Sequence, residues 1–171
     1  MAETGIMETT QFLTFKLGDE VFALDITKVR EVLDFTAVTK VPRTPAFMRG
    51  VSNLRGNVVP IVDLRLLFGL SQTEKTINTC IIITEVTVDG ETLVLGVLAD
   101  AVEEVLALEA DRIDPPPRIG MHLNTEFIRG MGKRENVFII ILDMDRIFSA
   151  EQLALVRGEQ LGGEGKDTAS P

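Results

Sequence analysis

The sequence contains an internal repeat whose two copies lie 80 residues apart. The first copy spans residues 47–68 and the second spans residues 127–148. Identical residue types recur at matched positions, among them Phe47 and Phe127, Arg49 and Arg129, Gly50 and Gly130, and Asp63 and Asp143. Because a repeated pattern indicates a repeated structural unit, we expect two similar units rather than one large sheet.

The two copies differ in the turn between their strands. The first copy carries Asn53-Leu54-Arg55-Gly56, which the second copy lacks. Positions that both copies share are explained by folding the same unit twice, so the unshared turn is a candidate for a specific function. An arginine on a tight turn can donate a fork of hydrogen bonds to a carboxylate or to helix-end carbonyls. We therefore place the function at Arg55; the alternative is that Arg55 pairs internally with an acidic residue across a groove.

Alternating apolar residues separated by turn residues predict β-hairpins. The predicted strand pairs cover residues 11–24, 47–64 and 80–98, and residues 25–33 are predicted as an irregular turn followed by a strand. Pro60 lacks an amide hydrogen, which predicts that its strand lies at a sheet edge or at least misses one ladder bond. Asp63 is predicted to cap a short helix.

The predicted fold is all-β, with two small barrels that share a core and with short helices. The expected organisation is a mobile leader over 1–10, one domain over 11–156 with intertwined subdomains at roughly 11–70 and 80–150, and a disordered tail over 157–171. Ser149 with Gln152 predicts a capped terminal helix that reaches Val156.

Composition excludes several classes of function. A formal net charge of −9 and a pI near 4.7 disfavour nucleic acid or an anionic membrane as partner, because both need a cationic surface. No apolar run is long enough to insert into a membrane. We expect a cytoplasmic protein whose partners are other proteins. Cys80, the single cysteine, opens an apolar run and is expected to behave as a small hydrophobe.

The sequence shows no catalytic apparatus. His122 is the only histidine, so neither a nucleophile–base pair nor a typical metal site can be assembled, and no phosphate-binding or dinucleotide-binding fingerprint is present. The repeated carboxylates at Asp25, Asp63, Asp100 and Asp143 are best explained as caps and turn formers. We expect no enzyme activity, no cofactor and no metal. Pro115-Pro116-Pro117 could present a polyproline ligand, although a stiff connection suffices to explain it.

Several runs of the chain resemble the CheW family of bacterial chemotaxis coupling proteins. The most specific run is Thr44-Pro45-Ala46-Phe47 followed by Gly50-Val51-Ser52-Asn53-Leu54-Arg55-Gly56, and residues 12–20, 28–32 and 59–65 also match. The resemblance covers about residues 11–156. It implies two SH3-like five-stranded β-barrels around a shared hydrophobic core. It also implies a non-enzymatic scaffold that links chemoreceptor cytoplasmic tips to the regulatory domain of the histidine kinase CheA and is recruited to membrane-associated receptor arrays.

The resemblance also assigns site residues. It places receptor binding at Val29, Glu31, Asn53 and Arg55, with second-half contributions from Val97 and Leu98, and kinase binding at Ile26, Val38, Arg49 and Gly50. Two alternatives stay open: a coupling protein of the same fold that serves a non-flagellar output pathway, and a β-barrel sensor that binds a small apolar molecule between its halves.

Overall fold

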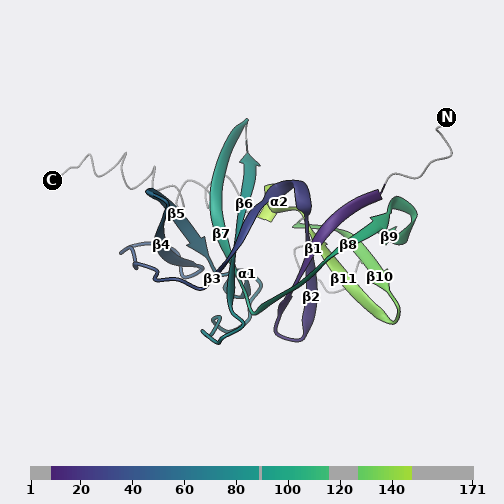
Figure 1. Ribbon diagram of the computed structural model, residues 1–171, viewed down its shortest axis with the longest axis horizontal. Coiled ribbons are helices and arrows are strands. Elements are labelled where there is room, and N and C mark those ends of the chain that lie inside the picture. Colours follow the sequence, from purple (N-terminus) through teal and green to yellow (C-terminus); the bar gives the residue numbers. More distant parts are fainter. Residues whose placement is uncertain (1–8, 89, 116–126, 148–171) are drawn as a thin grey trace.

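A computed structural model describes residues 9–88, 90–115 and 127–147, and these residues form mainly β-strands (Figure 1). The strands are β1 (Thr9–Leu17), β2 (Glu20–Asp25), β3 (Val29–Asp34), β4 (Met48–Leu54), β5 (Asn57–Val62), β6 (Cys80–Val88), β7 (Glu91–Ala99), β8 (Ala101–Glu109), β9 (Ile113–Asp114), β10 (Ile128–Arg134) and β11 (Val137–Leu142). The helical segments are η1 (Ile26–Lys28), α1 (Leu64–Leu67), η2 (Ala110–Arg112) and α2 (Met144–Ile147). None of the helices in these ranges is long and apolar enough to cross a membrane. The all-β prediction is confirmed.

The strands form two sheets of matching design. One sheet has the order β3-β6-β7-β5-β4 and the other has the order β8-β1-β2-β11-β10-β9. In both sheets, a hairpin pairs through its second strand with a parallel strand, β7 with β5 and β2 with β11. The internal repeat of the sequence therefore appears as a repeated strand order.

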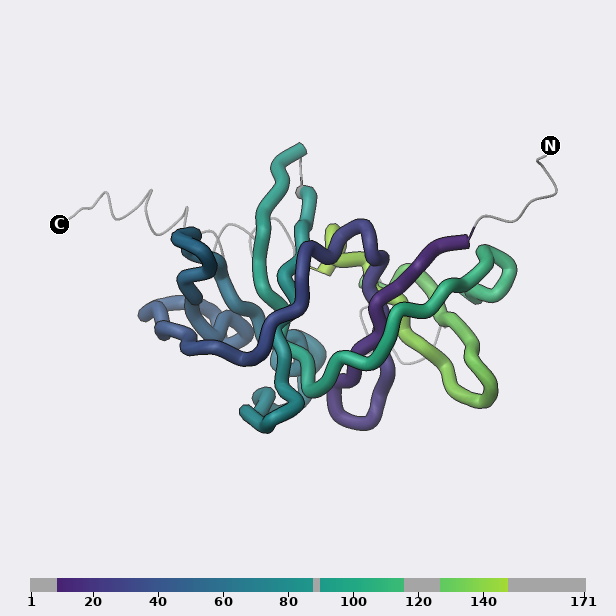
Figure 2. The backbone as a smooth tube through the Cα atoms, viewed as in Figure 1, coloured from purple at the N-terminus to yellow at the C-terminus, as the bar shows by residue number. Residues whose placement is uncertain are grey.

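The two halves of the chain exchange hairpins. The β1–β2 hairpin pairs with β8 and β11, whereas the β6–β7 hairpin pairs with β3 and β5. Each sheet thus draws strands from both of the ranges 11–70 and 80–150. Figure 2 shows the two passages, in which β3 carries the chain from one sheet to the other and β8 carries it back. Neither sheet can be completed by one half of the sequence alone.

The main apolar core joins the two sheets, as predicted, and each sheet also carries a smaller apolar cluster of its own. The buried members of the main core come from both sheets, for example Leu24 of β2 and Ile82 of β6. Four phenylalanine rings stack in a row within it: the centroids of Phe15 and Phe22 lie 6.0 Å apart, those of Phe22 and Phe68 lie 5.6 Å apart, and those of Phe68 and Phe127 lie 4.8 Å apart. Because the row joins the β1–β2 hairpin to residues of both repeat copies, it ties the exchanged hairpin to the core.

Local structure differs from the sequence prediction in two places. β1 begins at Thr9, two residues before the predicted start of order. Of the two placements predicted for the Pro60 strand, the sheet edge is wrong, because β5 lies between β4 and β7, whereas the missing ladder bond agrees with the β5–β7 pairing. Pairing of β5 with β7 involves only Ile61 and Val62, so the proline that lacks a donor comes just before the paired residues. The predicted terminal helix, the tail, His122 and the rest of the leader lie outside the described residues.

Candidate functional site

Arg55 lies at the tip of the hairpin between β4 and β5. Arg55 and Gly56 both have positive φ, 55° and 85°, as a two-residue hairpin turn requires. The side-chain oxygen of Asn53 accepts a hydrogen bond of 3.0 Å from the Gly56 amide, which caps the turn. This geometry holds the Arg55 backbone in place and leaves its side chain 74% exposed.

Glu31 of β3 holds the Arg55 guanidinium in a two-pronged ion pair. Arg55 Nη2 donates to Glu31 Oε1 at 2.9 Å, and Nη1 donates to Oε2. The hydrogen bond from Arg55 holds the pKa of Glu31 below its ordinary value, against a smaller opposing effect of desolvation. β3 and β4 are the two end strands of their sheet, so this pair draws the ends of the sheet together.

The surroundings of this pair are partly apolar. A cavity of about 460 Å³ lies between β3, the Arg55 turn and β7, and its lining includes Leu54, Val58 and Leu93. Val58 is 69% exposed beside the turn. We call Glu31, Asn53, Arg55 and Val58 the Arg55 surface. Its partial apolar character and its orientated guanidinium suit binding to another protein.

Three of the four predicted receptor-binding residues lie together in the structure, and the fourth does not. Glu31, Asn53 and Arg55 come together, and the internal partner that the sequence left open for Arg55 is Glu31 itself. Val29 begins β3 and packs, half-buried, against the main core. The suggested second-half contributors Val97 and Leu98 are fully buried, so they cannot line an open surface.

Three of the four predicted kinase-binding residues lie at a second cavity. Val38 and Arg49 line a groove of about 970 Å³. Gly50 lies beside it with a φ of 143°, and an added Cβ would meet the carbonyl oxygen of Thr39 at 2.1 Å. The absence of a side chain at Gly50 therefore lets the backbone of β4 lie close to the backbone at Thr39. Ile26 lies apart in η1 and packs against the main core.

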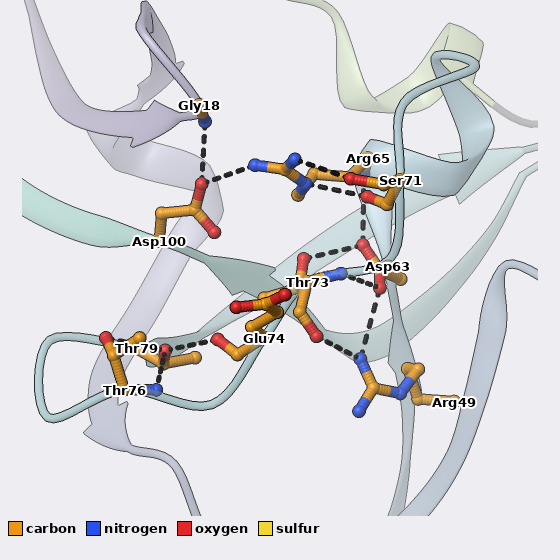
Figure 3. A network of polar contacts seen from close by, with 10 residues as sticks. All are labelled: Gly18, Arg49, Asp63, Arg65, Ser71, Thr73, Glu74, Thr76, Thr79 and Asp100. Carbon is orange, nitrogen blue, oxygen red and sulfur yellow. Dashed lines mark hydrogen bonds and ion pairs between the residues drawn. The ribbon is translucent and has the colours of Figure 1, made fainter.

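A buried polar network holds the wall of this groove (Figure 3). The fully buried carboxylate of Asp63 accepts hydrogen bonds from Arg49 Nη1 at 3.1 Å, from the Thr73 amide at 3.0 Å and from the Thr73 hydroxyl at 2.8 Å. It also caps α1 by accepting from the Arg65 amide at 3.1 Å, as predicted. The Arg49 guanidinium is thus bound inside the molecule, and the segment that carries Thr73 is held against the first repeat copy.

A second network links the exchanged hairpin to the same region. Asp100 Oδ2 accepts from the Gly18 amide in the β1–β2 turn at 2.6 Å and from Arg65 Nη1 at 2.7 Å. Arg65 also donates to the Ser71 carbonyl at 2.7 Å. Figure 3 shows these contacts beside the Asp63 network. Together they hold the groove wall and the hairpin in one arrangement.

Sequence reasoning missed an ion pair on the second copy. Arg134 at the end of β10 pairs with Glu104 of β8. A signal was available, because Glu104 matches Glu31 in the run that repeats at an offset of 73 residues. Cys80 is half-buried, donates to the Asn78 carbonyl at 3.3 Å, and has a pKa raised by burial. Within the described residues, no group of three potential ligand side chains is arranged to hold a metal ion.

Comparison with known proteins agrees with this fold. A family model described as a CheW-like domain matches residues 11–152. The chemotaxis protein CheW of Klebsiella aerogenes is 38% identical over 146 residues, which cover 85% of this chain and 86% of that protein. The probable chemotaxis protein CheW of Rhizobium etli is 34% identical over 139 residues, which cover 81% of this chain and 87% of that protein. The solved structure of the scaffolding protein TtCheW from Thermoanaerobacter tengcongensis matches with a TM-score of 0.74 and 34% identity, over 85% of this chain and 96% of that one.

Proposed function

Because this chain belongs to the CheW family, we propose that it is a non-enzymatic adaptor that couples the cytoplasmic tips of chemoreceptors to the histidine kinase CheA. Relatives named as chemotaxis proteins and a solved relative named as a scaffolding protein support this role. In this role the protein works in the cytoplasm and is recruited to receptor arrays at the membrane.

The observation that carries the proposal is the geometry of the Arg55 surface. A guanidinium has five N–H donors in a rigid plane, and only part of this set is used by Glu31. The ion pair therefore orientates Arg55 and leaves donors for a partner's carbonyl or carboxylate oxygens. Val58 beside it supplies apolar contact area. We assign receptor binding to this surface.

We assign kinase contact to the neighbourhood of Val38, Arg49 and Gly50. Arg49 and Gly50 belong to β4, an end strand of its sheet, and Val38 precedes Thr39, whose amide and carbonyl exchange hydrogen bonds of 2.8 Å with Val51 of β4. Ile26 is set apart from them in η1, so we do not extend the contact to it.

A charge-swap series tests the receptor assignment. Arg55→Glu alone should lower capture of a receptor-tip fragment at least tenfold, because it removes the donors and places two carboxylates together. The double variant Glu31→Arg with Arg55→Glu restores an internal ion pair but presents a carboxylate at the turn. If Arg55 binds the receptor, the double variant stays defective; if the pair is only structural, the double variant recovers.

The readouts are receptor-tip pull-down and receptor-controlled kinase activity in a reconstituted mixture. Arg134→Glu is the matched control, because it breaks the corresponding ion pair on the other sheet. Thermal melts should show that every variant is folded. Normal receptor capture by folded Arg55→Glu would contradict the assignment.

A further inference from the structure

Arg30 is a second arginine at the cavity of about 460 Å³ that lies beside the Arg55 surface. Arg30 and Glu31 are consecutive residues of β3, and both line this cavity. In a regular strand, consecutive side chains point to opposite faces of the sheet, so only one of the two is expected at any one cavity. The presence of both therefore requires a local change in the strand.

A β-bulge in β3 explains this placement. Val29 pairs with Thr84 of β6, whereas Glu31 pairs with Ile83, and the register shifts between these two pairs. Two steps along β3 thus correspond to one step along β6, and Arg30 is the extra residue. A bulge of this kind re-aims side chains relative to the regular alternation. It brings the charged groups of Arg30 and Glu31 to the same cavity.

Glu85 of β6 orientates Arg30 and leaves the end of its side chain open. Arg30 Nε donates to Glu85 Oε2 at 2.6 Å, and the Arg30 side chain is 56% exposed. Among the residues that the structure describes, neither terminal nitrogen of Arg30 has an acceptor. Arg55 is bound in the opposite way, because both of its terminal nitrogens donate to Glu31. Arg30 therefore offers a partner the fork that Arg55 uses internally.

The open fork of Arg30 favours a carboxylate. Most N–H donors of a guanidinium belong to its two terminal nitrogens, and two parallel hydrogen bonds from them match the two oxygens of a carboxylate. The acidic groups at this site are already used, because Glu31 accepts from Arg55 and Glu85 accepts from Arg30. The rest of the lining is mainly apolar and comprises Leu54, Asn57, Val58, Val59, Ile83, Leu93 and Val94. The surface therefore has donors in excess beside an apolar floor.

The second copy of the fold shows that the bulge itself does not require an arginine. The residue that matches Arg30 at an offset of 73 is Glu103 of β8. The register of β8 against β1 also shifts at this place, between the residues that pair with Leu13 and Phe15. Because a glutamate stands at the matched bulge, folding of the strand does not explain the cation in β3. Binding explains it.

We propose that Arg30 is a second receptor-contact residue, whose terminal nitrogens bind a carboxylate of the receptor tip in a two-pronged contact. Glu85 is a positioning residue that acts through Arg30. The occupant carries an acidic side chain next to apolar ones, and the apolar ones pack on the cavity lining beside Val58. This inference rests on the proposed function, because it takes the occupant to be the receptor tip.

A double-mutant cycle tests the contact. The dissociation constant of a labelled receptor-tip fragment is measured by fluorescence anisotropy with the full-length protein, and each Asp or Glu of the fragment is replaced in turn by Asn or Gln. Arg30→Gln should weaken binding about tenfold. One of the replacements should weaken binding to the wild type to a similar extent, yet have little further effect on Arg30→Gln. Arg30→Lys keeps the charge without the fork and should bind with intermediate affinity.

Two further variants separate binding from structure. Glu85→Gln leaves Arg30 in place but removes the carboxylate that orientates it, so binding should weaken by less than in Arg30→Gln. Lys133→Gln removes one positive charge from the other sheet and should bind normally, which controls for net charge. Thermal melts of all variants should stay close to that of the wild type, because the Arg30 side chain is 56% exposed.

Two results would overturn the inference. One is unchanged binding by folded Arg30→Gln. The other is a scan in which no acidic residue of the fragment couples to Arg30, because Arg30 would then act only on the structure of β3 or through net charge.

The result can be told apart from that of the proposed function. If the wild type bound no receptor tip, the adaptor role would fail and this inference with it. If Arg55→Glu abolished binding while Arg30→Gln did not change it, only this inference would fail. If Arg30 coupled to an acidic residue while Arg55→Glu bound normally, the assignment of Arg55 would fail and that of Arg30 would stand.

Discussion

The two copies of the repeat use the same residues at the same positions but give them different partners. In the first copy, Arg49 donates to the buried carboxylate of Asp63 at 3.1 Å. In the second copy, Arg129 donates to Asp25 of the exchanged hairpin at 3.3 Å, and Asp143 instead accepts from the Asp145 amide at 3.1 Å. The difference teaches that a repeat predicts backbone form, whereas side-chain pairing depends on which neighbouring segment packs against each copy.

The turns of the two copies share their backbone shape but differ in the charge that they present. Arg55 and Glu135 occupy matched positions and have the same φ of 55°. Each copy also has an ion pair between a guanidinium near its turn and a glutamate on β3 or β8. The turn shape and the ion pair are therefore shared, and what distinguishes the first copy is the positive charge at the tip of its turn.

The sharpest test of this comparison is to remove the matched aspartates. Asp63→Ala leaves Arg49 without its counter-ion and the Thr73 amide without an acceptor, so it should lower the free energy of unfolding by about 3–5 kcal/mol. Asp143→Ala removes the acceptor of the Asp145 amide at the start of α2 and a surface ion pair with Arg146, and should cost only about 1 kcal/mol. Urea denaturation of both variants measures the difference. Equal losses would show that the two copies are energetically equivalent after all.

The matched glycines should give the next largest difference. In Gly50→Ala, the new Cβ meets the Thr39 carbonyl oxygen at 2.1 Å at a strained φ, so we expect a loss of about 2–3 kcal/mol. In Gly130→Ala, the nearest backbone atom is the Asp114 oxygen at 2.8 Å, on the two-residue edge strand β9. β9 can move more easily, so the loss should be smaller. Denaturant midpoints compare the two, and a larger loss at Gly130 would reverse the ranking.

The smallest expected effect is on titration of Glu31. The pKa of Glu31 is lowered by the hydrogen bond from Arg55, so the stabilisation from this carboxylate is present above its ordinary pKa and is lost as pH falls through the lowered one. Arg55→Gly keeps the positive φ and should raise the Glu31 pKa towards its ordinary value. Carboxyl carbon NMR shifts against pH measure this change. Arg134→Ala should leave the Glu31 pKa unchanged, and a shift there would indicate coupling between the sheets.

Much of the fold could be predicted because it depends on local patterns. Alternating apolar residues around Gly18-Asp19 predicted the first hairpin, and Asp63 before an apolar run predicted the cap of α1. Pro60 correctly indicated a missing ladder bond but not a sheet edge, because the absence of one amide hydrogen does not exclude an interior strand whose pairing starts one residue later. The assignment of receptor and kinase binding to particular residues stays a prediction.

The candidate site was predictable only in part. The clustering of Glu31, Asn53 and Arg55 follows motif positions, but the groove beside Val38 and Arg49 depends on Phe35, Leu66 and Gln72, which come from three different segments. No periodicity in the sequence relates such segments, because their approach is set by the packing of the sheets. The burial of Val97 and Leu98 was missed for the same reason.

By itself, the sequence determined that the chain folds twice into the same strand pattern, since hydrophobic alternation and turn residues act over a few neighbouring positions. Only the tertiary structure decided that the β1–β2 and β6–β7 hairpins change places between the sheets, and that Arg49 and Arg129 therefore meet different carboxylates. The physical reason is the sequence separation over which each interaction acts. A pattern of neighbouring residues sets the form of a strand, whereas burial in a shared core selects which strands lie beside it.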